Sequence, residues 1–358
     1  MLDCQTGKNT LLRTRGEIIL NSIIRQYVEK AQPVSSGSVL DECGLDISSA
    51  TIRSEVTRLE AEGYIQRPHY AAGSIPSDKG YRYFVSSLKP AELPLEEQFL
   101  INHLFHQVED RLEEWLNLAV SVLSQRVKNV VVVTAPRSVT SRFKHVEMVS
   151  IQPTLVLMVL VLQGAKVRQQ LINFEEAVSQ QELAGSTAKL NQLFASLPHK
   201  QITAKLAELD AGERRLAERI LHLMAAEDNR TDQDVFLEGW HFLLNQPEFS
   251  HGQKLAALID LAEQKKLANM VMPEATRGYG VEVIIGGENK AEYIQDCSII
   301  ASRYGLPGEP LGSIAVVGPT RMDYDRTIAV TGYVASIISL LVAELYGLTP
   351  EASGESGN

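Results

Sequence analysis

Residues 48–83 read SSATIRSEVTRLEAEGYIQRPHYAAGSIPSDKGYRY, and this stretch decides the fold of the N-terminal region. Ile52, Val56 and Leu59 recur at i, i+4 and i+7, a spacing that predicts one apolar stripe along a helix. The other side carries small, hydroxylated or cationic residues, which let a helix backbone approach the base edges in a DNA major groove. These residues are Ala50, Arg53, Ser54, Thr57 and Arg58, with Thr51 at the edge. The stretch therefore predicts a DNA-reading helix.

The segments before this helix complete a helix-turn-helix. Apolar residues recur at helical spacing over residues 14–30, which predicts a first helix of about four turns, and Pro33 ends it. Gly44 supplies the turn between the second and third helices, because glycine adopts a positive φ at no steric cost. The candidate N-caps are Ser35 or Ser36 for the second helix, and Asp46 or Ser48 for the third.

A wing follows the third helix, which is expected to end at Gly63. Residues 64–69 predict one wing strand, and residues 72–73 its loop tip. A wing of this kind touches the DNA backbone beside the groove. The residues assigned to that role are Arg67, His69 and Lys79. Together these elements predict a winged helix-turn-helix DNA-binding domain over residues 1–89.

Two groups of motifs give the chain a specific resemblance to a known family. The first signature comprises SATIRSE at 49–55, LEAEGYIQRPH at 59–69 and AGSIPSDKGYRYFV at 72–85, and the second comprises IIGGEN at 284–289, QDCSIIAS at 295–302 and GSIAVVGPTRMDYDR at 312–326. With these motifs in this order, the chain resembles the HrcA family of heat-inducible transcription repressors nearly end to end. It departs from the family pattern where Ser49 stands for a common Pro, Ser54 for a common Asn and Ser74 for a common Arg. The missing arginine removes a candidate phosphate contact from the wing.

Composition fits a globular protein of several domains. A chain of 358 residues exceeds the usual size of one domain, so two or three are expected. The longest unbroken apolar run is 155–162, far short of the ~20 residues that span a bilayer, and the N-terminus lacks a secretory pattern. Cys4, Cys43 and Cys297 are scattered without metal-ligand spacing, which indicates reduced thiols. We expect a soluble cytoplasmic protein with no membrane segment, metal or cofactor.

The charge distribution bears on how the chain would bind DNA. The formal net charge is −10, of which residues 1–90 contribute +1 and the remainder −11. An acidic protein with a near-neutral reading domain is not suited to sequence-blind binding of nucleic acid. Affinity must then come from a local basic patch, from base contacts and from pairing two DNA-binding domains.

The remainder of the chain predicts a sheet that is interrupted by a helical block and then resumed. A hinge is expected at 89–94, because Pro90 and Pro94 both break helices. The predicted elements are a long helix over 95–127, strands at 130–134, 146–151, 155–162 and 166–174, a mostly helical block over 180–268, strands at 281–285, 297–304 and 313–318, and a final helix over 327–346. This is the pattern of one domain inserted into another.

The resemblance to the HrcA family gives these parts names and a function. It implies an α+β multidomain protein with a GAF-like α/β sensor-type domain at 95–180 and 269–348, and an inserted, mostly helical dimerising domain at 181–268. It further implies a homodimeric repressor of chaperone genes that binds an inverted-repeat operator in double-stranded DNA and is modulated by the GroE chaperonin during stress. The alternative is a winged-helix regulator whose GAF-like domain senses a metabolite. An enzyme is not expected, because no catalytic constellation can be argued from the spacing of residues.

Three other features invite a site but have simpler interpretations. His103 and His106 have a spacing that metal ligands use, yet no third ligand lies nearby in the sequence. Gly286 and Gly287 could cradle a phosphate, but the motif lacks the lysine of a P-loop, and a tight strand-ending turn is the better interpretation. In the loop before the last helix, Asp323 or Thr320 can cap that helix, which leaves Arg321 for an ion pair or an interface.

Overall fold

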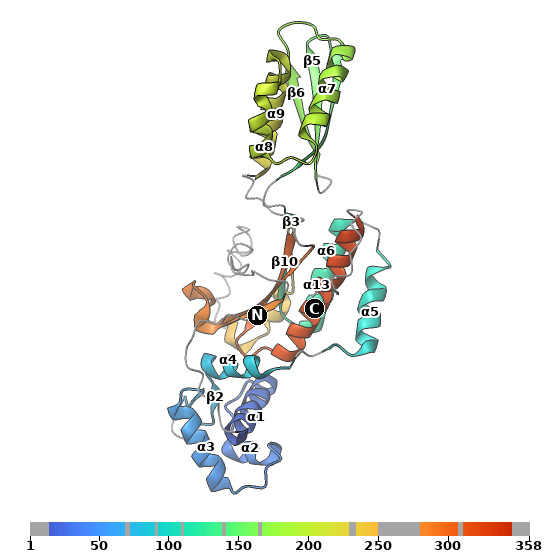
Figure 1. The fold of residues 1–358 in the computed structure, drawn as a ribbon. Coiled ribbons are helices and arrows are strands. Elements are labelled where there is room, and N and C mark those ends of the chain that lie inside the picture. Colours follow the sequence, from blue (N-terminus) through green and yellow to red (C-terminus); the bar gives the residue numbers. More distant parts are fainter. Residues whose placement is uncertain are drawn as a thin grey trace, which may run out of the picture. The chain divides into compact units, whose positions relative to one another are not determined.

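The computed structural model describes residues 14–68, 72–89, 92–108, 111–137, 141–163, 167–228, 234–249, 280–306 and 311–345 (Figure 1). Helices and strands are mixed along the chain, which confirms an α+β protein. The chain divides into two compact units. The first comprises residues 1–134, 235–303 and 313–337, and the second comprises residues 135–234, 304–312 and 338–358.

The N-terminal part of the first unit, residues 14–89, is called the head. Its elements are α1 (Thr14–Lys30), α2 (Ser36–Glu42), α3 (Ser49–Ala61), β1 (Ile65–Gln66), β2 (Ile75–Pro76) and α4 (Asp78–Ser87). Strands β1 and β2 pair antiparallel, with Ile65 opposite Pro76. The predicted apolar stripe of α3 is buried and meets the buried side chains of α1, among them Ile19 and Ile23. The order and the core of the head therefore match the prediction.

Local capping explains where the helices of the head begin. Of the alternatives left open by the sequence, Ser35 caps α2 and Ser48 caps α3, since each side chain accepts a hydrogen bond from a backbone N–H of the first turn. Gly44 and Gly63 have φ of 61° and 78°, so both turns use the left-handed conformation that glycine favours. The helix ends thus follow from single residues.

The remainder of the first unit is called the body, and it is built on a five-stranded sheet. The strand order is β7-β3-β10-β9-β8, in which β7 pairs antiparallel with β3 and β8 with β9. The strands are β3 (Val130–Arg137), β7 (Val235–Glu238), β8 (Val281–Ile285), β9 (Cys297–Tyr304) and β10 (Leu311–Pro319). The helices are α5 (Leu95–Phe105), α6 (Leu112–Val127), α10 (Trp240–Leu244) and α13 (Tyr324–Leu345), with short 3-10 turns at Pro247–Phe249, Gly286–Glu288 and Glu292–Ile294. The sheet combines strands from both sides of the inserted segment, as the sequence pattern predicts.

Burial on both sides of this sheet accounts for its continuous apolar strands. Val130, Val132 and Val317 pack in a core cluster with Leu243 and Phe249 from α10 and the turn after it. The alternating residues Val131, Val133, Ile314 and Val316 are also buried, and Figure 1 shows α6 and α13 running alongside the sheet.

Helix α13 is, among the described residues, the helix long and apolar enough to cross a membrane by composition. Half of its most apolar window is buried inside the protein, and Val330 and Val334 are fully buried. A core helix of a soluble protein passes the same composition test, so this helix is weak evidence for a membrane span.

The predicted helix over 95–127 is wrong in one respect. The structure has two helices, α5 and α6, and α5 ends with His106 as its C-cap. The intervening sequence HQVEDR contains neither glycine nor proline, so no local signal marks the break. Of the predicted hinge, residues 90–91 lie outside the described residues.

The second unit has its own three-stranded sheet. Strands β4 (Phe143–Gln152), β5 (Leu155–Leu162) and β6 (Val167–Asn173) form an antiparallel meander, and the helices are α7 (Gln180–Phe194), α8 (His199–Lys205) and α9 (Ala211–Asp228), with a 3-10 turn at Leu206–Glu208. One face of the sheet packs on these helices. The core residues include Val146, Met148, Met158 and Leu160 of the sheet and Leu183, Leu190, Phe194, Ile220 and Met224 of the helices.

The inserted segment is therefore larger than the sequence indicates. The boundary at 180/181 assigns β4–β6 to the same domain as β3. In the described part of the chain, however, these strands form a sheet of their own and lie within the segment 135–234 of the second unit. Strand propensity is the same for either sheet, so pattern alone could not assign them. Strand β7 also lies within the block that was expected to be helical, and residues 250–279 of that block lie outside the described residues.

Candidate nucleic-acid interface

The outer face of α3 is exposed along its whole length. Its exposed residues follow helical spacing on the side opposite Ile52, Val56 and Leu59, and they are Ala50, Arg53, Ser54, Thr57 and Ala61. Arg53 is the one long side chain among these five. The α3 face, as we call this set, is thus a narrow surface of small groups from which one guanidinium projects.

Arg53 is the residue of the α3 face best placed to bind a ligand. Its guanidinium has no ion-pair or hydrogen-bond partner among the described residues. The neighbouring hydroxyls are partly engaged: Thr57 donates to the Arg53 carbonyl at 2.9 Å, and the Thr51 hydroxyl lies 3.0 Å from that of Ser48. Of the predicted base-reading residues on α3, Arg53 and Ser54 are the most available.

Arg58 lies in a different environment. Its Nη2 is 2.8 Å from Oε2 of Glu55, its Nε is 3.6 Å from Oε1 of Glu62, and the side chain is 28% exposed. A Cβ on Gly16 of α1 would overlap this guanidinium. Arg58 therefore braces α3 against α1, and two carboxylates balance its charge.

The residues predicted to contact the DNA backbone also form contacts within the head. Arg67 forms an ion pair with Glu60 at 3.3 Å. Lys79 donates to the Glu62 carbonyl at 2.7 Å and lies 4.3 Å above the Tyr64 ring, so its charge meets the negative end of α3. Both cations lie beside α3 and are at least partly exposed, while His69 lies outside the described residues.

A second set of polar residues joins the head to the body. Arg82 of α4 makes a two-pronged ion pair with Glu288, and Asp78 accepts a hydrogen bond from the Gly287 N–H at 2.8 Å. A second contact is made by α1, because Arg321 donates to the Val28 carbonyl. The first and second signatures thus meet in space.

Arg321 is held by body residues while it reaches α1. It pairs with Glu248 and donates to the Gln246 amide oxygen, and only 12% of its side chain is exposed. Burial and the Glu248 carboxylate raise the pKa of nearby Tyr27, so that hydroxyl stays protonated at neutral pH. The sequence indicated that Arg321 would form an ion pair or lie at an interface. Arg321 does both, because it pairs with Glu248 of the body and bonds to α1 of the head.

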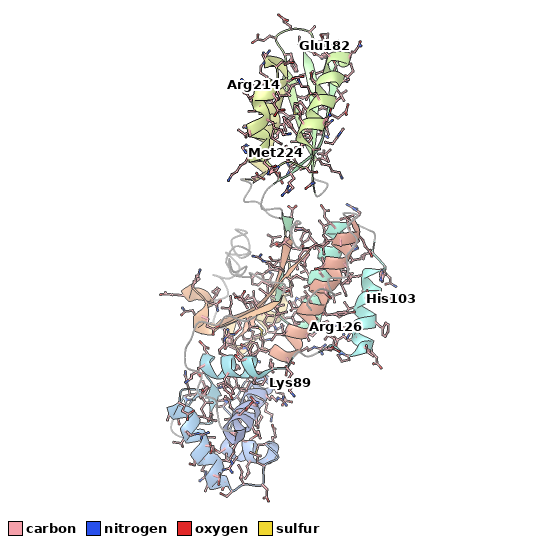
Figure 2. The ribbon with its side chains drawn as sticks, viewed as in Figure 1. Lys89, His103, Arg126, Glu182, Arg214 and Met224 are labelled. Atoms are coloured by element: carbon pink, nitrogen blue, oxygen red, sulfur yellow. The ribbon has the colours of Figure 1, made fainter. Side chains whose placement is uncertain are left out.

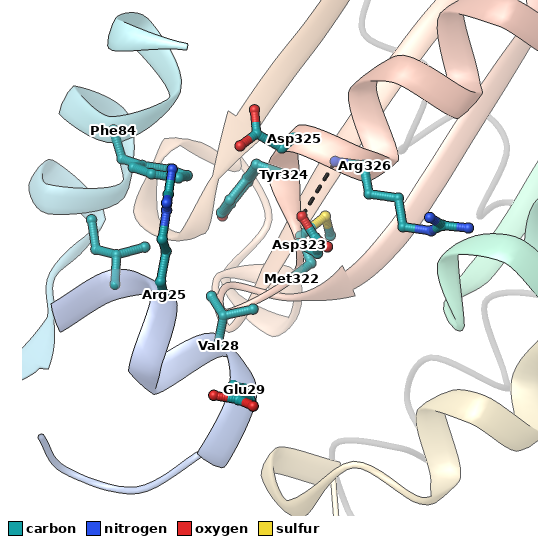
Figure 3. A pocket seen from close by; sticks show the side chains of 10 residues that line it. Arg25, Val28, Glu29, Phe84, Met322, Asp323, Tyr324, Asp325 and Arg326 are labelled. Atoms are coloured by element: carbon teal, nitrogen blue, oxygen red, sulfur yellow. Dashed lines mark hydrogen bonds between the residues drawn. The ribbon is translucent and has the colours of Figure 1, made fainter. Parts of the chain in front are cut away.

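A cleft of about 670 Å³ opens between α1 and the start of α13 (Figure 3). Its charged lining residues are Arg25, Glu29, Asp323, Asp325 and Arg326. Asp323 caps α13 by accepting from the Arg326 N–H, as one of the predicted alternatives has it. Burial and the Asp323 carboxylate raise the pKa of Asp325. Because both acidic and basic side chains line it, the cleft does not present a single sign of charge to a ligand.

His103 of α5 and its C-cap His106 belong to no metal-binding cluster of described residues. The His103 ring nitrogen lies 2.8 Å from the Gln107 amide, and Figure 2 shows His103 on the outer helix α5. In the part of the chain that the structure describes, no group of three or more His, Cys, Asp or Glu side chains is arranged to hold a metal ion.

A helical head with an exposed, small and cationic helix face, joined to a larger α+β body, is the architecture of DNA-binding transcription regulators. Comparison with known proteins narrows that class. The chain belongs to the HrcA family, because the family model described as HrcA protein C terminal domain matches residues 113–328.

Full-length relatives support the same assignment. A heat-inducible transcription repressor HrcA of Dehalococcoides mccartyi is 52% identical over 96% of this chain and 100% of the relative. One from Roseiflexus castenholzii is 36% identical over 97% of this chain and 99% of the relative. A crystal structure of a hypothetical protein, at 22% identity, has a TM-score of 0.57 and covers 93% of this chain and 99% of that chain, which supports the fold alone.

Sequence reasoning missed the roles of Asp78, Arg82 and Glu288. Asp78 and Arg82 lie inside the first signature but are not on α3, and Glu288 lies 206 residues after Arg82. The paired glycines Gly286 and Gly287 were the available signal, because a turn without side chains allows another element to approach closely.

Proposed function

We propose that this chain represses the transcription of heat-shock genes by binding an inverted-repeat operator as a homodimer. The observation that carries the proposal is the α3 face, where Arg53 projects from small residues and has no partner among the residues that the structure describes. In this proposal the head is a winged helix-turn-helix, α3 lies in the major groove, and Arg67, His69 and Lys79 contact the backbone. The printed names of the relatives support the direction of regulation.

The second unit supplies the dimer in this proposal. The face of its sheet opposite the helices is rich in apolar side chains, and we call it the open face. The apolar members are Val149, Ile151, Leu155, Leu157, Val159, Val161, Val167 and Leu171. Val149, Leu157 and Leu171 form one apolar row across all three strands, because Leu157 pairs with both of the others.

An apolar sheet face of this extent favours a protein partner over water. A second copy satisfies it most simply, since a two-fold dimer places identical faces together and presents two identical heads to an inverted repeat. The helical residues Leu183, Leu190 and Phe194 of the same unit are buried against the other face of the sheet. The dimerising function is therefore assigned to the strands.

The GroE chaperonin is the proposed modulator. The body sheet pairs strands from both sides of a hundred-residue insertion, and such long-range pairing folds slowly and exposes apolar surface meanwhile. A chaperonin that assists this step sets the fraction of active repressor. Unfolded proteins that occupy the chaperonin during heat stress would then release the genes from repression.

A footprint of the purified protein on its own genome's chaperone promoters tests DNA binding directly. We expect protection of an inverted repeat and no protection of a scrambled repeat of the same composition. A chain that protects neither, or both equally, would contradict sequence-specific repression.

A heating series tests the modulator. We expect operator binding to fall on mild heating before circular dichroism shows loss of helix, and chaperonin with ATP to restore it. The matched control is chaperonin without ATP, which should not. Full operator affinity throughout the heat-shock range, with no response to chaperonin, would contradict this part of the proposal.

A further inference from the structure

The contact between α4 and the Gly286–Glu288 turn is unusually complete for a surface ion pair. Arg82 donates through Nε to Oε1 of Glu288 at 2.7 Å and through Nη2 to Oε2, so both prongs of the guanidinium meet the carboxylate. The same Nη2 donates to the Val283 carbonyl of β8 at 2.6 Å. Glu288 is fixed in turn, because it accepts from the Ile285 N–H at 2.8 Å. Planar two-pronged pairs of this kind specify an orientation as well as a distance.

Close backbone approach reinforces this contact. Gly286 has a φ of 51°, and a Cβ at this position would overlap the Asp78 carboxylate. Asp78 uses that proximity to accept the hydrogen bond from the Gly287 N–H. The first turn of α4 therefore packs directly against the Gly286–Glu288 turn, because the glycines have no side chain that would separate the two backbones.

A second attachment lies at a different place on the head. Arg321 crosses from the loop before α13 to the Val28 carbonyl near the end of α1. Between the two attachments, the buried rings of Tyr81 and Tyr324 lie with centroids 5.7 Å apart, and the Tyr324 hydroxyl lies 2.7 Å from that of Ser298. Two separated attachments resist rotation of the head, whereas a single one would act as a pivot.

We propose that Arg82 and Glu288, supported by Asp78 and Arg321, are positioning residues that set which spacing between half-sites the repressor accepts. The inference rests on the proposed function, since it requires two DNA-binding heads in one dimer. None of the four residues reads a base. Their role is to fix the direction in which each α3 face points, so that both faces meet the duplex together only at the matching spacing.

The test measures affinity as a function of operator spacing. Duplexes carry the footprinted repeat with its natural spacer, with about 2 extra base pairs, and with about 5 extra base pairs, which turn one half-site to the opposite side of the helix. A single half-site serves as the reference. For the wild type we expect affinity to fall about tenfold or more between the natural and the 5-base-pair spacer, towards the half-site value.

Two variants remove the pair with opposite changes in charge. Arg82→Gln and Glu288→Gln should both reduce the effect of the spacer to about threefold or less and leave half-site affinity unchanged. The matched controls are Lys290→Gln and Glu292→Gln, exposed residues close to Glu288 that make the same charge changes outside the contact. A direct electrostatic effect on DNA would shift the two variants in opposite directions, whereas positioning shifts them in the same direction.

The outcomes separate this inference from the proposed function. Wild-type protein that ignores the operator contradicts the proposed function, and with it the inference. Wild-type protein that binds the operator with no dependence on spacing contradicts the inference alone. The inference alone is also contradicted if the Arg82→Gln and Glu288→Gln variants keep the wild-type dependence on spacing while their melting temperatures match those of the controls. Arg82→Lys, which keeps the charge but not the two-pronged geometry, should give an intermediate profile.

Discussion

The α3 face and the open face of the second unit both carry exposed side chains, yet the chemistry of the two faces differs. The first presents Arg53 among small and hydroxylated groups, and the second presents the row Val149, Leu157 and Leu171. A cationic face made of small side chains suits a polyanion with a grooved surface, and an apolar sheet suits another apolar sheet. The comparison shows that an uncovered surface indicates the class of its partner through its composition.

The two faces also differ in how much of their polar chemistry is already satisfied. On the head, Arg58, Arg67 and Lys79 have partners, whereas Arg53 has none within the described part of the chain. On the open face the apolar side chains outnumber the polar ones, which are His145, Glu147, Gln169 and Asn173, and His145 Nε2 lies 3.3 Å from Oε2 of Glu147. Specificity is therefore expected to depend on few residues of the head, while dimer affinity is spread over many residues of the sheet.

The largest effect is expected from a charge on the open face. Leu157→Asp places a carboxylate at the centre of the apolar row and should leave a largely monomeric protein. Operator affinity should then fall by ~10²–10⁴, because the second head no longer binds as part of the same molecule. Light scattering and fluorescence anisotropy measure the two effects.

Ala184→Asp, at an exposed position of α7 in the same unit, is the control for this change. It should leave both mass and affinity at wild-type values. If the Leu157→Asp protein remained dimeric, the dimer contact would lie on another surface. The proposed role of the open face would then be wrong.

The next effect concerns base reading. Arg53→Ala should cost about 1–3 kcal/mol of specific binding and relax preference at one position of each half-site. Binding to random DNA should change much less. Equal weakening on operator and random DNA would identify Arg53 as a phosphate contact instead.

A smaller effect is expected from the cap of α3. Ser48→Ala removes the acceptor for the Thr51 N–H and should lower the free energy of unfolding by about 1 kcal/mol. Thermal unfolding followed by circular dichroism measures the loss. Ser48→Asp, which keeps an acceptor, should retain most of the stability, and an equal loss in both variants would mean that the cap contributes little.

The smallest effect distinguishes the two arginines of α3. Arg58→Ala removes a partly exposed ion pair and should cost less than about 1 kcal/mol of stability, with little change in sequence preference. Selection from randomised operators compares its preference with that of Arg53→Ala. If both variants showed a relaxed base preference, Arg58 would have to break its ion pairs with Glu55 and Glu62 and contact DNA bases.

Much of the local structure was predictable, because it depends on neighbours in the sequence. The bounds of α1, β5 and β8 follow from apolar periodicity, and the turns at Gly44 and Gly63 from backbone freedom. The α3 face was predictable for the same reason. The sequence did not predict which strands pair with one another, because nothing in the sequence of β4–β6 indicates which sheet these strands join.

Within the candidate site, the same division holds. Periodicity placed Arg53 and Arg58 on one side of α3, but it could not show that Glu55 and Glu62 hold Arg58 beside α1. It also could not bring Arg82 to Glu288, which requires the fold of the whole body. Sequence pattern therefore predicted the exposed face of α3 and missed the contacts that join the head to the body.

The order of strands in the body has a consequence for how the protein is made. The bond from the Ser313 N–H to the Thr134 hydroxyl joins β10 to the end of β3 across 179 residues. At a translation rate of 5–20 residues per second, β10 leaves the ribosome roughly 10 to 35 s after β3. The head, whose core is drawn from α1 and α3, emerges earlier still. For that interval each nascent chain carries a head that can fold while the sheet that supports it is still incomplete.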